Sequence, residues 1–194
     1  EVGFEMIIYT FGSGLNMENA DPAYLAKVKA DVDYAHSKGL EVGAYSLFSS
    51  RRVDDANDVI NPKTGKSGGA IFGNAPCFGS QWGINYLRRI TNFLAQTGLD
   101  LLEHDGHYPG DVCAATNHPG HRAEADSQWV NWSMSAKLYR WCREQGIYIN
   151  QPDYYFFASG NKTAMGYRED NWSLPRAQQL IHARQNIYDG TWTK

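Results

Sequence analysis

Residues 98–105 read GLDLLEHD, an apolar stretch that ends in charged side chains. Gly98 is suited to close a preceding helix, and the leucines after it favour a buried strand. Side chains alternate along a strand, so Leu101, Glu103 and Asp105 share one face. The stretch therefore predicts a strand that leaves Asp105 at its C-terminal end.

Strands and helices alternate along the rest of the chain. We expect strands at residues 4–9, 40–47, 99–104, 147–151 and 163–168. We expect four helices: one from Asp21-Pro22 to Gly39, one through Leu87 that stops at Gly98, one capped by Asp126 that ends near Gly146, and one capped by Ser173.

The connections after the strands are long and those before them are short. Polar stretches at 49–79 and 106–125 follow two strands, whereas residues 37–39 and 97–98 complete tight turns. This asymmetry is typical of an α/β fold whose site lies at the C-terminal ends of parallel strands, as in a TIM (β/α)8 barrel. A doubly wound open sheet is the alternative, although no Gly-x-Gly-x-x-Gly motif supports nucleotide binding.

The five expected strands are too few for a closed barrel, which needs eight strands and roughly 250 residues. We therefore expect residues 1–194 to form a segment of a single catalytic barrel domain, holding about strands 2 to 6.

The composition is that of an ordinary globular protein. The net charge is −3, so no basic surface indicates nucleic acid, and no apolar run is long enough to span a membrane. Aromatic residues make up 13%, which suits either a large core or a carbohydrate site, where flat rings cover sugar faces. Oligomeric state and localisation stay open.

The three cysteines are too few for a disulfide scaffold. Cys77 and Cys113 lie in expected loops, and Cys142 lies in an expected helix. A disulfide between Cys77 and Cys113 could form if the protein is exported, and three free thiols are the alternative.

Two acidic side chains follow expected strands and fit glycosidic cleavage. A carboxylate at the strand end, such as Asp105, is placed for catalysis, because an apolar core would not accept it without a partner. Asp170 follows a second strand, with Glu169 as its substitute. Retaining cleavage needs one nucleophile and one acid/base, with carboxyl groups about 5–5.5 Å apart.

The same region has a second interpretation, as a metal site. His104, Asp105, His107 and Asp111 could hold a divalent ion, with help from His118 and His121. The spacing matches no strong metal motif, so we expect neither a metal nor another cofactor.

Three stretches resemble α-galactosidases of glycoside hydrolase families 27 and 36, in clan D. Residues 40–46, LEVGAYS, resemble the third strand of those enzymes. Residues 98–105 resemble the fourth strand, which ends in Lys-x-Asp, and 166–171, GYREDN, resemble the sixth-strand region of family 36. The resemblance implies that Asp105 is the nucleophile and Asp170 the acid/base of a retaining α-glycosidase.

The resemblance and the position of the loops together suggest a set of substrate-binding residues. They are Tyr45, Cys77, Trp82, Glu103, His104, His107, Tyr154 and Arg168. Glu103 stands where the families have Lys, which points to a divergent member. The alternative functions are a non-catalytic carbohydrate-binding barrel and a metal-dependent hydrolase built on His104, Asp105 and His107.

Overall fold

The computed structural model describes residues 3–70, 73–105, 111–152, 165–168, 175–178, 180–181, 184 and 192–193. The elements in chain order are β1 (Met6–Tyr9), α1 (Pro22–Ser37), β2 (Glu41–Leu47), α2 (Gln81–Thr97), β3 (Leu101–Asp105), α3 (Glu124–Glu144), β4 (Tyr148–Pro152), β5 (Met165–Arg168) and β6 (Trp192–Thr193).

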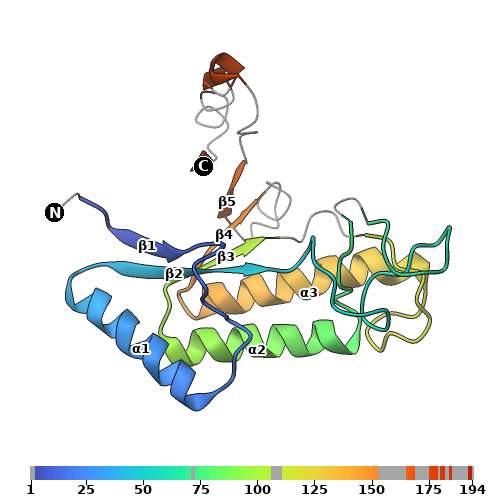
Figure 1. Cartoon of the computed structure of the whole chain (residues 1–194), viewed down its shortest axis with the longest axis horizontal. Coiled ribbons are helices and arrows are strands. Elements are labelled where there is room, and N and C mark those ends of the chain that lie inside the picture. Colours follow the sequence, from blue (N-terminus) through green and yellow to red (C-terminus); the bar gives the residue numbers. More distant parts are fainter. Residues whose placement is uncertain are drawn as a thin grey trace.

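The strands form one parallel sheet in the order β1-β2-β3-β4-β5-β6. Figure 1 shows α1, α2 and α3 together on one side of the sheet. A doubly wound sheet would reverse its strand order and carry helices on both faces. The α/β class with a parallel sheet is therefore confirmed, and the doubly wound alternative is wrong for the described residues.

The five expected strands are all present, each within about two residues of its predicted bounds. The two-residue strand β6 was not predicted, because a stretch that short carries no pattern. The predicted cap of α3 is wrong by a few positions. Asp126 lies inside the first turn of the helix, where its carboxylate accepts from the backbone N–H groups of Arg122 and Ala123. Ser173 lies outside the described residues, and residues 176–178 are helical.

The core lies between the sheet and these helices. Val42, Ala44 and Leu102 point from the strands toward the helices and are at most 2% exposed. Ile90 and Phe93 of α2 pack against them and are fully buried. Each of the larger side chains contributes about 1.5–3 kcal/mol by leaving water, so this layer is a major source of apolar stabilisation.

The other face of the sheet carries Glu103 and Asp105, as the alternation predicts. Gly43 pairs with Leu101 on this face. A Cβ atom at Gly43 would lie 2.8 Å from Leu101 Cδ2, so a side chain there would push the strands apart. Tyr45 pairs with Glu103, and Glu103 pairs with Asn150 on the next strand.

Candidate active site

Asp105 closes β3 and lies next to the end of β2. Its carbonyl oxygen accepts a 2.7 Å hydrogen bond from the N–H of Phe48, which fixes the two strand ends together. The Tyr45 hydroxyl donates a 2.5 Å hydrogen bond to Asp105 Oδ2. Both side chains are half-buried. The arrangement orients one carboxylate oxygen of Asp105.

A pocket of about 390 Å³ lies at the C-terminal ends of β1 and β2. It is lined by residues 10–18 after β1, by 45–47 at the end of β2, and by Arg51. Tyr45 therefore lines the pocket and also bonds to Asp105. A volume of this size is in the range of small-molecule sites.

The positively charged side chain of Arg51 lies in the wall of the pocket and contacts two other residues. Arg51 Nη1 lies 2.6 Å from Glu18 Oε1, and the Arg51 guanidinium lies 4.8 Å from the centre of the Trp82 ring. Trp82 in turn stacks on Tyr86, with ring centres 5.2 Å apart. These contacts position the guanidinium at the pocket wall and place Trp82 behind it.

His104 lies on the helix side of the sheet rather than on the side of Asp105. Its Nδ1 is 2.7 Å from the Tyr139 hydroxyl, and its Nε2 is 3.0 Å from the Tyr86 hydroxyl. Burial lowers the pKa of His104 to about 4, although the charge of Asp105 opposes the shift. Both ring nitrogens are engaged with tyrosines, which gives no support to the metal-dependent hydrolase.

Glu103 is only 1% exposed and lies on the same face as Asp105. The register places it between Tyr45 on β2 and Asn150 on β4. Glu103 is therefore a buried acidic residue on the same strand and face as Asp105, two residues before the strand ends.

Cys77 lies away from this pocket. It is fully buried beside Cys113, His118 and His121, in the one group of cysteine, histidine and acidic side chains that could hold a metal within the described part of the chain. All three cysteines are free thiols, so the Cys77–Cys113 bridge is not formed. His118 and His121 therefore cluster with two cysteines, and not with His104 as the metal-site interpretation expected.

Several predicted site residues lie outside the described residues: His107, Tyr154, Glu169 and Asp170. For Arg168 the structure describes only the backbone, which pairs with Thr193 of β6.

Sequence reasoning missed Glu18 and Arg51, which line the pocket. Arg51 comes four residues after the end of β2, in a long loop after a strand, and that position was the available signal. Glu18 had no comparable signal, because it lies far from any expected strand end in the sequence.

No model of a known protein family matches the sequence, and no curated protein matches it either. Solved structures do resemble it. The α-N-acetylgalactosaminidase of Bifidobacterium bifidum, in a Gal-NHAc-DNJ complex, superposes with a TM-score of 0.51 at 19% identity over 77% of this chain and 26% of that chain. A quadruple mutant of that enzyme gives a TM-score of 0.50 at 18% identity over 78% and 27%. The chain thus spans about a quarter of those structures and shares the fold of that part of an α-glycosidase.

Proposed function

We propose that this chain is a segment, about strands 2 to 6, of a TIM (β/α)8 barrel of a retaining α-glycoside hydrolase. The observation that carries the proposal is Asp105, which stands at the C-terminal end of a parallel strand and accepts a hydrogen bond from Tyr45, a residue that lines the pocket. The sequential strand order with helices on one face supports the barrel, because right-handed crossovers in one direction produce both features.

In the proposed reaction the Asp105 carboxylate attacks the anomeric carbon, and the glycosidic C–O bond breaks as Asp170 gives a proton to the leaving oxygen. Water then attacks the same carbon, Asp170 takes its proton, and the bond to Asp105 breaks. The Tyr45 hydroxyl holds the attacking carboxylate in one orientation.

The substrate class that we propose is an α-linked galactose or N-acetylgalactosamine. The α-galactosidase resemblance of residues 98–105 supports the first sugar, and the fold shared with an α-N-acetylgalactosaminidase supports the second. The Arg51 guanidinium at the pocket wall is suited to bond sugar hydroxyls in a forked geometry.

Trapping the covalent intermediate tests the proposal. The purified protein is incubated with fluorinated α-glycosyl fluorides of galactose, N-acetylgalactosamine and glucose, which form the glycosyl-enzyme quickly and release it slowly. Peptide mass spectrometry then locates the label, which we expect on Asp105.

A label on another carboxylate would contradict the assignment of the nucleophile. Binding of a sugar without label or turnover would favour the non-catalytic carbohydrate-binding barrel instead. The Asp105→Asn variant is the control, because it should bind the same sugar and take up no label.

A further inference from the structure

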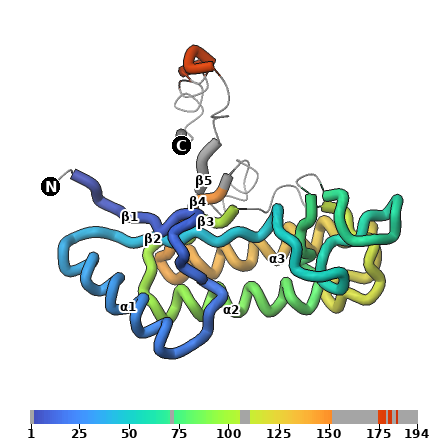
Figure 2. Tube along the Cα trace, viewed as in Figure 1, coloured from blue at the N-terminus to red at the C-terminus, as the bar shows by residue number. Residues whose placement is uncertain are grey.

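Two loops meet at one end of the molecule and bury four side chains between them. Cys77 belongs to the loop between β2 and α2, residues 48–80, and Cys113, His118 and His121 belong to the loop between β3 and α3, residues 106–123. Figure 2 shows the two loops gathered at the end where α2 and α3 begin. The two sulfurs and two ring nitrogens all lie within 4.8 Å of one another.

Two of the separations between these atoms match the edges of a metal tetrahedron. Zinc binds His nitrogen at about 2.0–2.1 Å and Cys sulfur at about 2.3 Å, so tetrahedral N–N and N–S edges are about 3.3 Å and about 3.6 Å. His118 Nδ1 is 3.3 Å from His121 Nε2 and 3.6 Å from Cys113 Sγ. These two separations match the tetrahedral edges, and all the others are at most 4.8 Å, so modest shifts of the side chains would let them accept an ion at their centre.

The surrounding backbone orients the ligands toward that centre. His118 Nε2 lies 3.0 Å from the carbonyl oxygen of Ala56, so it carries the ring proton and leaves the Nδ1 lone pair facing the cluster. The N–H of Ile60 donates a 3.4 Å hydrogen bond to Cys113 Sγ. A backbone carbonyl behind the imidazole and an N–H on the sulfur are the usual second partners of zinc ligands.

The charge of such a site suits its burial. Cys77 and Cys113 are fully buried, and the two histidines are at most 5% exposed. Two thiolates and two neutral imidazoles around Zn²⁺ carry no net charge, so the filled site avoids the cost of a buried charge. Both cysteines bind zinc as thiolates, so the metal displaces the protons that the thiols carry.

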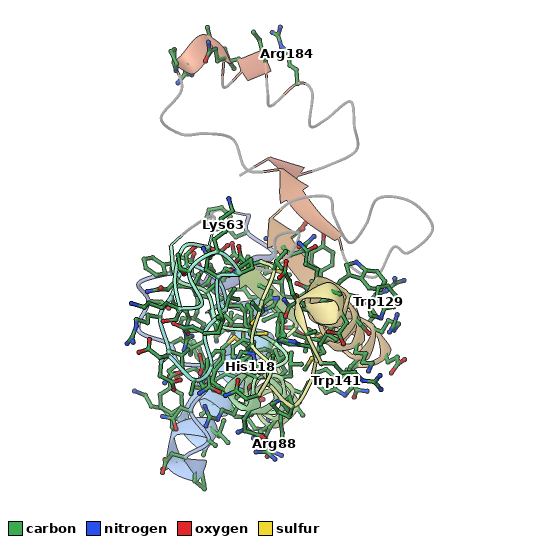
Figure 3. The ribbon with its side chains drawn as sticks, turned by 90° about the vertical axis from the view of Figure 1, so that its right-hand side faces the viewer. Lys63, Arg88, His118, Trp129, Trp141 and Arg184 are labelled. Carbon is green, nitrogen blue, oxygen red and sulfur yellow. The ribbon has the colours of Figure 1, made fainter. Side chains whose placement is uncertain are left out.

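We propose that Cys77, Cys113, His118 and His121 bind one structural Zn²⁺ ion that joins the two loops. The mixed sulfur and nitrogen set selects zinc over the hard cations, and four protein ligands leave no open position for catalysis. Figure 3 labels His118 within the body of side chains.

The two loops also contact each other closely at two glycines beside the cluster. The N–H of Gly120 donates a 2.7 Å hydrogen bond to the carbonyl of Gly79, and a Cβ atom at Gly120 would lie 2.7 Å from Gly79 Cα. A Cβ atom at Gly79 would lie 2.5 Å from His121 Cδ2. Cys77 also accepts from Ser80 through its carbonyl, so the metal would fix the start of α2 directly.

Metal analysis tests the proposal on the protein purified under reducing conditions without chelator. We expect close to one zinc per chain. After zinc is removed and Co²⁺ is added, we expect the thiolate charge-transfer band and the strong visible bands of tetrahedral cobalt. Cys113→Ser and His118→Asn should weaken zinc binding at least tenfold. Cys142→Ser is the matched control, because Cys142 is equally buried but lies in α3 outside the cluster.

Protein that holds no zinc and gives only the spectrum of aqueous Co²⁺ would overturn the proposal, as would an intact Cys77–Cys113 disulfide found by peptide mapping. These readouts need no activity, so they stay separate from the test of the glycosidase. If Cys113→Ser fails to fold, the cobalt spectrum of the unchanged protein still decides. Loss of zinc from Cys142→Ser with normal binding by Cys113→Ser would also contradict the assignment.

Discussion

Two aspartates lie at opposite ends of β3, and their surroundings differ. Asp100 lies just before the strand, where its Oδ2 accepts a 2.8 Å hydrogen bond from Val42 N–H and lies 2.7 Å from His36 Nε2. Asp105 ends the strand and accepts a hydrogen bond from Tyr45, a residue that lines the pocket. The connections near Asp100 are short, and those after Asp105 are long. The same type of side chain therefore joins β2 to the start of β3 at one end and, in the proposed function, acts on a ligand at the other.

The largest effect should separate these two aspartates by activity. Asp105→Asn keeps the shape of the side chain but removes the nucleophile, so we expect kcat to fall by about a thousandfold or more. Asp100→Asn should leave kcat within about twofold, because it lies at the opposite end of the strand. Steady-state kinetics on a nitrophenyl α-glycoside measures both.

Circular dichroism confirms that each variant is folded before its rate is compared. Equal losses of activity in the two variants would remove the distinction between the two ends of the strand.

His104 extends the comparison, because it precedes Asp105 in the sequence but is buried on the helix side of the sheet. The folded ring takes a proton only near pH 4, since burial lowers its pKa to about 4, whereas the unfolded ring titrates near 6.5. Between these values the unfolded state binds more protons, so stability falls as the pH falls through this window and is constant above it. We expect a loss of up to about 3 kcal/mol in the free energy of unfolding.

Urea unfolding of the wild type and His104→Gln across this window measures the effect. The variant should be less stable at neutral pH and should lack this part of the pH dependence. An identical slope in both proteins would show that His104 is not the group responsible.

Tyr45→Phe removes the hydroxyl that orients Asp105 and leaves the ring against Phe11, with ring centres 5.8 Å apart. We expect kcat to fall by about a hundredfold with little change in KM, because the hydrogen bond acts on the reacting carboxylate. Rate and KM are measured separately. A change confined to KM would place Tyr45 in sugar binding instead.

The smallest effect belongs to the other end of the strand. Asp100→Ala leaves the N–H of Val42 without its acceptor and removes the partner of His36, both in a partly exposed position. We expect the free energy of unfolding to fall by about 1–2 kcal/mol, with unchanged activity per folded molecule. Thermal unfolding measures it, and a loss of activity beyond the unfolded fraction would contradict the separation of roles.

The order and type of the longer elements could be predicted because their apolar spacing is strong. Val28 and Val32 mark the buried side of α1, and Leu102 marks that of β3. Boundaries were less certain: Asp126 is a good capping residue but acts from within the first turn of α3. The position of Asp105 at a strand end followed from the apolar stretch that stops before it, and its face followed from the alternation of β3.

The partners of the candidate site could not be read from the chain in the same way. Tyr45 and Asp105 meet only through the register of β2 and β3, which no local pattern encodes. Cys77 lies far in the sequence from the other three residues of the cluster. The spacing of Cys113, His118 and His121 matches no common zinc motif. Such contacts depend on how two long loops fold against each other.

The contact between Gly79 and Gly120 has a consequence for anyone who redesigns this protein. Neither loop can accept a side chain at its glycine without displacing the other. The two loops should therefore be exchanged between homologous proteins as one cassette, since a graft of either alone would pair a foreign loop with a partner shaped for the original.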